Sequence, residues 1–379
     1  MKSSAGTVMA IALFAASLTG CTTCCTRFTR QPAGTPSNEV VQEFPSRSTM
    51  RTAWRVRWAA GPGKGLYITG AWFKRGPSEP WMRVLWDARL SEIFVPYHSG
   101  SPRYYDLGGF GFDIEDANER DTGCCGRLLG TSPRRIVWEV RDRGVLWKND
   151  QQVRRGEELV LWATIDAANY NYIVHYGFRD DGSIAFRVAG TAENLPGRRW
   201  ESHMHNGLWR VDIDLNGASN DSALITRHSE SVSGPSATDS DAPFNSGVEG
   251  WANWNDLRFT QLRVRDTVKR NEQGKNIAYD VRPVRFGTPR HQEDFARHDF
   301  WVSRYRSTEL YYPMVADYVS NNESVTNTDV VLWHISPLHH MPRSEDGNDA
   351  NGWNGVALAM WGGFDLRPRD LFDGTPLYP

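Results

Sequence analysis

The stretch NYNYIVHYGFRDDGSIAFRVAG, residues 169–190, decides the fold class of this chain. Two runs rich in β-branched and aromatic residues, YIVHYGF and SIAFRVAG, flank the pair Asp181-Gly182. An Asp-Gly pair between such runs favours a tight turn, because glycine readily adopts the positive φ that these turns require. The stretch therefore predicts two antiparallel strands joined as a hairpin.

Similar runs recur along the rest of the chain. They include ARLSEIFVPY (88–97), RRIVWEVRDRGVLWK (134–148) and DVVLWHISPL (329–338), separated by Gly, Asn, Asp and Pro. Sustained helical periodicity is hard to find, and no fixed-period repeat indicates a propeller or a solenoid. We therefore predict an all-β chain folded as a large antiparallel β-sandwich.

The composition excludes two classes of protein. The 379 residues include 43 Lys and Arg against 45 Asp and Glu, which gives a formal net charge of −2. This balance argues against a strongly basic nucleic-acid binder and against a disordered acidic chain. Only one segment, near the N-terminus, is continuously apolar, so a multi-span membrane protein is excluded as well.

The N-terminus has the pattern of an export signal. The apolar segment from Val8 to Leu18 is too short to span a membrane, and Leu18-Thr19-Gly20-Cys21 follows it in a way that resembles a bacterial lipobox. We expect a signal peptide over 1–20, a lipid anchor at Cys21, a Pro- and Ser-rich tether over 21–48 and a folded domain over 49–379. This predicts a lipoprotein of the bacterial cell envelope. The alternative is a plain signal peptide with Cys21 as an ordinary thiol.

The first candidate site is a set of histidines. His203 and His205 lie in a predicted strand, where residues two apart share one face. A third candidate is His339 or His340, which lie on a turn in the segment LHHMPRSED (338–346). Imidazoles at this spacing suit copper or zinc, and nitrogen ligands without a nearby cysteine favour Cu(II). The alternative is a pair of surface or hydrogen-bonding histidines.

The second candidate site is rich in tyrosine. Tyr170 and Tyr172 project to one face of the predicted hairpin strand, while Tyr97, Tyr104 and Asp106 lie close to Gly108-Gly109. Without further context the strand tyrosines are packing residues. An Asp beside aromatic residues acts as a base when burial raises its pKa, although such residues more often lie in turns.

Together these pieces resemble the catalytic domain of the copper amine oxidases. That family has an N-Y-[DE]-Y strand, a distant H-x-H pair and a later His before a P-R-x-E-D turn, in the order found here. The resemblance implies that Tyr170, preceded by Asn169, becomes the topaquinone cofactor. It assigns copper binding to His203, His205 and His340. It also implies that Asp106 in Tyr104-Tyr105-Asp106-Leu107-Gly108 is the catalytic base, that Tyr104 is the gate, and that Tyr97 hydrogen-bonds the cofactor.

The resemblance implies an activity and further partners. Members of the family convert primary amines and O2 to aldehydes, ammonia and hydrogen peroxide, and they are homodimers. Asp212, Asp214 and Asp329 match the carboxylate ligands of a peripheral cation site, where oxygen-only ligation suits Ca²⁺. The alternative there is a solvated acidic strand end. No nucleic-acid partner is expected.

Two departures from the family pattern leave a second function open. Asp166 stands where the family has Thr, and Asn171 stands where it has an acidic residue directly after the cofactor tyrosine. The main prediction is an active, self-processing amine oxidase. The alternatives are a non-catalytic copper-binding or surface-interaction lipoprotein on the same fold, and a zinc hydrolase on the same three histidines.

Overall fold

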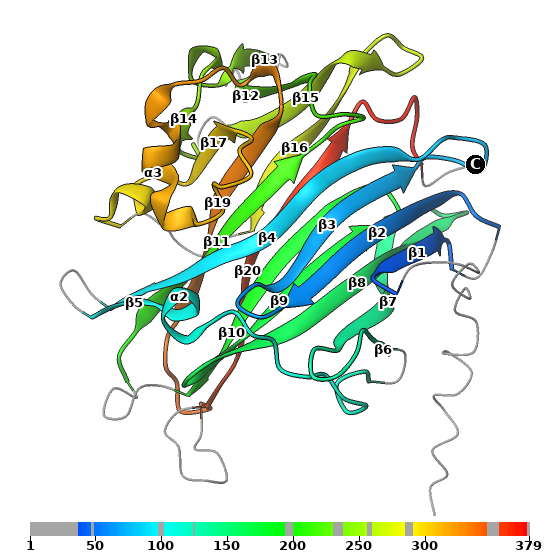
Figure 1. The fold of residues 1–379 in the computed structure, drawn as a ribbon. Helices are drawn as coiled ribbons and strands as arrows, with labels where there is room; N and C mark the ends of the chain where they lie inside the picture. The colour runs from blue at the N-terminus through cyan, green and yellow to red at the C-terminus, as the bar shows by residue number, and fades with distance from the viewer. Residues whose placement is uncertain are drawn as a thin grey trace, which may run out of the picture.

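The computed structural model describes residues 37–46, 49–97, 102–123, 126–193, 200–229, 238–255, 260–284, 291–346 and 356–376. Within these ranges two antiparallel sheets lie face to face, which confirms the predicted all-β sandwich (Figure 1). The expected signal peptide, Cys21 and most of the expected tether lie outside the described residues.

The first sheet carries nine strands in the described part of the chain. In spatial order they are β1 (Glu39–Phe44), β2 (Thr52–Gly61), β3 (Gly65–Lys74), β4 (Met82–Pro96), β11 (His203–Ile213), β19 (Val330–His340), β17 (Phe300–Arg304) and β14 (Gly250–Ala252), with β5 (Arg103–Tyr105) paired to β4. Strand β1 lies inside the segment 21–48 that we expected to be a tether. Its Val40 and Phe44 are buried, so the sheet begins at Glu39 rather than after residue 48.

The second sheet carries eleven strands in the same described ranges. Its order is β13 (Thr238–Pro243), β12 (Asp221–Ser229), β15 (Gln261–Arg270), β16 (Asn276–Val284), β20 (Val356–Arg369), β10 (Ile184–Glu193), β9 (Tyr170–Arg179), β8 (Val153–Ala167), β7 (Ile136–Lys148) and β6 (Arg127–Leu129), with β18 (Thr326–Thr328) paired to β12. Strands β9 and β10 are the predicted hairpin. Gly182 in their turn has φ 83°, the conformation for which glycine was expected.

Helical structure is confined to short turns in the described residues. These are α2 (Asp106–Phe110), α3 (Val315–Tyr318), η1 (Phe244–Gly247), η3 (Asp294–Ala296), η4 (Tyr312–Met314) and η5 (Val319–Asn321). None of the helices in these ranges has the length and apolar character needed to cross a membrane.

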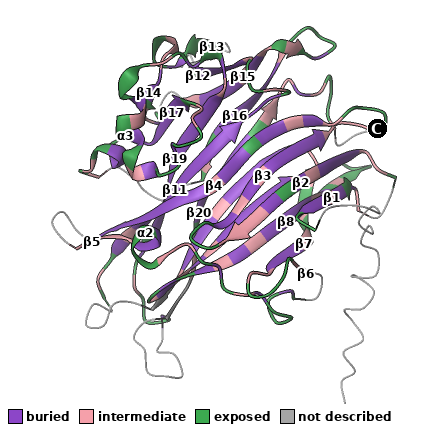
Figure 2. Ribbon diagram, viewed as in Figure 1, coloured by how far each residue is buried: buried purple, intermediate pink, exposed green. Residues whose placement is uncertain are grey.

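The main core fills the space between the two sheets. The central strands are buried along most of their length (Figure 2). Trp209 of β11 packs edge-on against Tyr176 and Phe186 at centroid distances of 5.7 Å, and against Phe364 at 6.1 Å. Aromatic side chains of this size bury much apolar area, so this cluster ties the sheets together.

A second core covers the outer face of the first sheet. Phe94, Leu208 and Trp333 alternate along their strands with residues of the main core, so they point to the opposite face. There they pack against the segment from η3 to η5, including Phe295 and Tyr312. This covering segment also supports the end of β4 that leads to α2, because the Tyr312 amide donates to Ser91 Oγ at 3.0 Å.

Candidate active site

The three histidines expected to bind copper meet at one end of the sandwich. His203, the first residue of β11, pairs directly with His340, the last residue of β19. Since alternate residues of a strand face the same side, His205 points the same way as His203. One ring nitrogen from each histidine lies within 4.8 Å of the other two, and all three side chains are buried. The neighbouring His339 is exposed and takes no part.

A polar neighbour lies at the far ring nitrogen of each histidine, and the neighbours of His203 and His205 are within hydrogen-bond distance. His203 faces a backbone carbonyl, His205 a tyrosine hydroxyl and His340 a carboxylate. These partners are Glu201 at 2.9 Å, Tyr172 at 2.7 Å and Asp346 at 3.9 Å. The remaining ring nitrogens point toward one another: Nε2 of His203, Nε2 of His205 and Nδ1 of His340. The two Nε2 atoms are 2.9 Å apart. Such outer partners fix metal-binding imidazoles in one orientation.

Burial keeps these imidazoles neutral. Desolvation lowers the pKa of His203 to about 4, lowers that of His205 well below its usual value, and lowers that of His340. A neutral imidazole offers a lone pair, and three of them without a thiolate suit Cu(II) or Zn(II). The donor set therefore fits the copper ion expected from the sequence.

Tyr170 lies directly beside this centre. Its hydroxyl is 2.9 Å from His203 Nε2 and 3.4 Å from His340 Nδ1. The two-residue turn between β8 and β9 places it there, with Ala168 at φ 62°. This left-handed conformation is strained for a residue with a Cβ, and such strain is concentrated at functional sites. The tyrosine predicted to become the cofactor is thus within reach of the metal ligands.

Asp106, the first residue of α2, is linked to the same centre through Tyr172. It accepts a hydrogen bond from the Tyr172 hydroxyl. Burial raises the pKa of Asp106 to about 7, the Tyr172 hydrogen bond lowers it, and the charge of Glu92 raises it further. A carboxyl with a pKa near 7 is poised to accept a proton at neutral pH.

Two further tyrosines complete the surroundings. Tyr97 stacks on the His203 ring at a centroid distance of 4.0 Å, and its hydroxyl hydrogen-bonds that of Tyr170. Burial raises the pKa of Tyr97 to about 12, so this phenol stays neutral. Tyr104 packs edge-on against Tyr97 at 5.9 Å.

A small cavity of about 40 Å³ opens between these groups. It is lined by Val95, Tyr97, Tyr104, Asp106, Phe110, Ala167, Asn169 and Tyr170. All five residues predicted to be catalytic line it, although they come from two segments of the sequence, 97–106 and 169–170. Sequence reasoning missed Phe110 and took Tyr172 for a packing residue. The spacing of Tyr172 two residues after Tyr170, on the same strand face, was the available signal.

The two departures from the family pattern lie away from the cavity. Asn171 alternates with Tyr170 and Tyr172, and it is directed to the outer face, where its side chain lies 3.3 Å from Glu115 Oε1. Asp166 pairs with Asn171 across β8 and β9 and is exposed. Neither substitution removes a group that faces the histidines.

The predicted carboxylate site lies at the other end of β11. The charge of Asp329 acts on Asp212 and that of Asp214 acts on Asp329, so the three carboxyls are neighbours. Arg210 Nη2 lies 3.8 Å from Asp212, and Arg83 Nη1 lies 3.0 Å from Asp214. Burial and then the charge of Asp329 raise the pKa of Asp212. Asp212 and Asp329 share a side-chain hydrogen bond, and among the described residues one buried oxygen of Asp214 has no hydrogen-bond partner. Buried oxygens without partners are the groups that a hard cation would satisfy.

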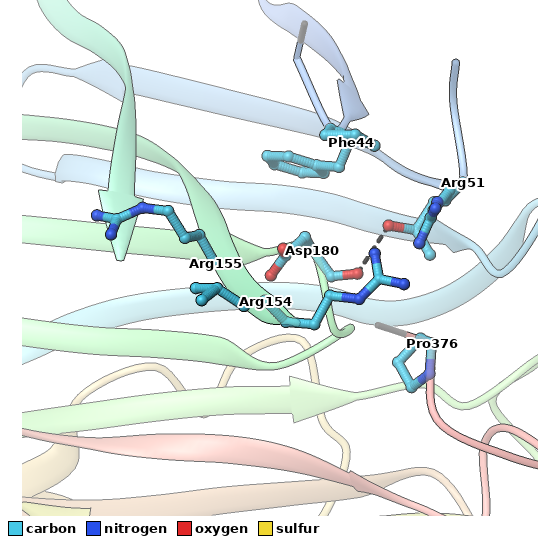
Figure 3. A pocket seen from close by; sticks show the side chains of 9 residues that line it. Phe44, Arg51, Arg154, Arg155, Asp180 and Pro376 are labelled. Atoms are coloured by element: carbon cyan, nitrogen blue, oxygen red, sulfur yellow. Dashed lines mark hydrogen bonds between the residues drawn. The ribbon is translucent and has the colours of Figure 1, made fainter. Parts of the chain in front are cut away.

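A larger hollow of about 330 Å³ is separate from this chemistry (Figure 3). Its lining includes Arg51, Arg154 and Asp180, and Thr52 Oγ1 donates to the Asp180 carbonyl at 2.7 Å. Tyr170 begins β9 and Asp180 follows its end, so about ten residues of strand, or roughly 30 Å, separate the two. This hollow does not contribute to the histidine site.

Comparisons with known proteins find sequence similarity to copper amine oxidases. Residues 196–378 match the family model described as copper amine oxidase, enzyme domain. Similar proteins include copper amine oxidase 1 of Aspergillus niger, 27% identical over 91% of this chain and 61% of its own length. Primary amine oxidase 2 of Arabidopsis thaliana is 24% identical over 85% of this chain and 57% of its own length. The chain thus spans little more than half the length of these relatives.

Solved structures show the same fold. A copper-containing benzylamine oxidase from Hansenula polymorpha matches 86% of this chain and 61% of its own chain, with a TM-score of 0.68 and 20% identity. An amine oxidase of Aspergillus nidulans matches 98% of this chain and 56% of its own, with a TM-score of 0.65 and 18% identity.

Proposed function

Because this chain carries a copper amine oxidase catalytic domain, we propose that it oxidises primary amines at the cavity beside Tyr170. The overall reaction consumes amine, O2 and water and yields aldehyde, ammonia and hydrogen peroxide. One observation carries the proposal: the Tyr170 hydroxyl lies 2.9 Å from His203 Nε2, while Asp106 lines the same cavity. A tyrosine at a copper centre and a base facing it are the two parts that this chemistry requires.

Each residue has a distinct role in this proposal. His203, His205 and His340 would hold Cu(II), and oxidation of Tyr170 would provide topaquinone. That cofactor supplies an electron sink, which no ordinary side chain provides. Asp106 accepts the proton from the carbon next to the amine nitrogen.

The tyrosines position and enclose these groups. Tyr97 holds the Tyr170 oxygen through their hydrogen bond. Tyr104 and Phe110 form apolar walls that limit the access of water.

The test is the appearance of a copper-dependent colour. The full chain is purified without copper, given Cu(II) in air, and then treated with phenylhydrazine while the visible spectrum is followed. We expect a quinone band and a coloured hydrazone in the wild type and in Tyr176→Phe, but neither in Tyr170→Phe. Tyr176 is a matched control, because it is a buried tyrosine on the same strand whose hydroxyl donates to the Leu66 carbonyl at 3.1 Å. Copper uptake without colour would refute the oxidase.

The buried carboxylates support a second, peripheral site, which we propose binds Ca²⁺. Asp212, Asp214 and Asp329 supply only oxygen ligands, as this ion prefers. Calcium should raise the unfolding temperature of the wild type but not that of Asp212→Asn. An equal rise in both proteins would exclude these carboxylates as the ligands.

Export, anchoring and dimerisation are also proposed. The segment Leu18-Thr19-Gly20-Cys21 supports a lipoprotein of the bacterial envelope, and labelled palmitate should be incorporated into the wild type but not into Cys21→Ser.

The resemblance to a homodimeric family supports a dimer. Light scattering of the purified chain would measure its mass, and a monomer at micromolar concentration would contradict this expectation.

A further inference from the structure

The helical turn that carries Asp106 has no cap of its own. α2 spans only Asp106–Phe110, and its N-cap residue Tyr105 makes no side-chain hydrogen bond to it. A single helical turn is unstable by itself, because nucleation fixes several residues for one hydrogen bond. The orientation of Asp106 must therefore be set by contacts from elsewhere in the fold.

Those contacts come from Glu92 on β4. Its Oε1 accepts from the Leu107 amide at 2.9 Å and from the Gly108 amide at 3.1 Å, and its Oε2 accepts from the Gly108 amide at 3.0 Å. Oε1 also accepts from the Ile93 amide at 2.8 Å. One carboxylate thus satisfies the free N–H groups at the start of the turn that directly follow Asp106.

The local fold is shaped around this carboxylate. Glu92 is completely buried, and it is hydrogen-bonded to the Tyr311 hydroxyl from the covering segment. A Cβ at Gly108 would lie 2.6 Å from Glu92 Oε2, closer than real Cβ atoms approach. Glycine at position 108 is therefore what lets the helical turn close on the carboxylate.

We propose that Glu92 is a positioning residue for proton abstraction, holding Asp106 in its reactive orientation through the Leu107 and Gly108 amides. The inference rests on the proposed function, because it requires Asp106 to be the base. Glu92 touches neither the cavity nor the histidines among the described contacts, so it acts only through α2. Misplacement of a reacting group by about 1 Å costs up to roughly a hundredfold in rate.

The titratable groups around Asp106 and Glu92 determine how the pKa of Asp106 changes when Glu92 is replaced. Tyr172 donates to Asp106, and the hydroxyls of Tyr97 and Tyr170 face the same cavity. Glu92 is the other nearby acid that raises the pKa of Asp106. On its own side, Glu92 is near the phenols of Tyr311 and Tyr105. Neutralising Glu92 should therefore lower the pKa of Asp106 as well as loosen α2.

The test compares Glu92→Gln with a matched control in the copper-loaded full chain. Amine is mixed with the protein without oxygen, and the rate of quinone bleaching is followed from pH 5.5 to 9. The amine is whichever of methylamine, benzylamine and putrescine the wild type turns over fastest. For Glu92→Gln we expect an unchanged phenylhydrazine titre, a fall in the maximal bleaching rate of about tenfold or more, and an acid limb moved to lower pH by about half a unit or more.

The control is Glu249→Gln. Glu249 is also completely buried and accepts from the backbone amides of Arg304 at 2.7 Å and Glu323 at 3.1 Å. It should lose stability in denaturant while its bleaching rate and pH profile stay those of the wild type. If Glu92→Gln behaves in the same way, Glu92 is only structural and the proposal is overturned.

A second variant separates geometry from charge and remains decisive if Glu92→Gln does not fold. Gly108→Ala pushes against the carboxylate but keeps its charge, so the bleaching rate should fall about tenfold with the acid limb in place. A wild-type rate in Gly108→Ala would overturn the positioning role. Absence of any quinone in the wild type would instead refute the proposed function, and the inference would fall with it.

Discussion

Replacing Tyr172 by Phe should shift the pH dependence of amine oxidation to higher pH. The Tyr172 hydroxyl donates to Asp106 and lies 2.7 Å from His205 Nδ1, and its side chain is completely buried. Phenylalanine keeps the ring and its packing but removes both polar contacts. The variant therefore removes the hydrogen bond to the proposed base together with the contact to His205.

The size of the shift follows from that bond. A hydrogen bond to a charged group contributes about 1.5–3 kcal/mol, and about 1.4 kcal/mol corresponds to one pKa unit. Loss of the Tyr172 hydrogen bond therefore raises the pKa of Asp106 by about one to two units. The pKa of Asp106 starts at about 7, where half of the carboxyl is ionised at neutral pH. At pH 7 the ionised fraction, and with it kcat/KM, should fall about 5- to 50-fold, and activity should recover as the pH rises towards about 9 or above.

The assay is kcat/KM for one amine from pH 5.5 to 10, with copper content and phenylhydrazine titre measured on each preparation. These two measurements separate an effect on Asp106 from damage to the histidine that loses a partner. An acid limb that stays in place would refute the role of Tyr172 in setting the pKa of Asp106. A uniform loss at every pH would do the same.

Three further predictions follow from other parts of the structure. Replacing His340 by Ala, or removing copper with a chelator before any exposure to air, should prevent the quinone colour, as measured by copper analysis and visible spectroscopy; full colour without copper would contradict the metal assignment. Trp209→Ala should destabilise the fold by about 3–5 kcal/mol in denaturant unfolding, because a completely buried side chain between the sheets is lost; a cost below about 1 kcal/mol would show that the core collapses into the gap. Burial lowers the pKa of His175 to about 3, so its stabilising contribution is fully present above pH 6.5 and is lost as the pH falls towards 3. His175→Gln should therefore flatten the fall in unfolding free energy between pH 6.5 and 4, and an unchanged slope would show that this histidine is not buried in its neutral form.

The fold class was predictable because its signals are local. The alternating apolar residues and Asp181-Gly182 predict the β9–β10 hairpin, since a strand pattern and a turn need only neighbouring residues. The predicted start of the folded domain at residue 49 was wrong, because the prediction also used only local signals. Val40 and Phe44 lie in a Pro- and Ser-rich segment, so no strand pattern was recognised there. Only the pairing with β2 shows that β1 belongs to the sheet.

The candidate site was predictable residue by residue, but not as an arrangement. The resemblance to copper amine oxidase motifs singled out Tyr170, Asp106 and the three histidines, because each motif has a characteristic side chain at a fixed offset. Tyr172 was taken for packing and Glu92 was not considered at all. Their roles depend on contacts with Asp106 and with α2, which lie 66 and 16 residues away in the chain.

The sequence by itself predicted the strands and the hairpin, because these follow from short-range periodicity and turn chemistry. Through its resemblance to the copper amine oxidases it also singled out the candidate metal-binding and cofactor side chains. Only the tertiary structure decided that His203 pairs with His340, that Tyr170 reaches both, and that Glu92 holds the turn bearing Asp106. Register between distant strands sets those contacts. A slip of one residue would turn each side chain to the opposite face of its sheet.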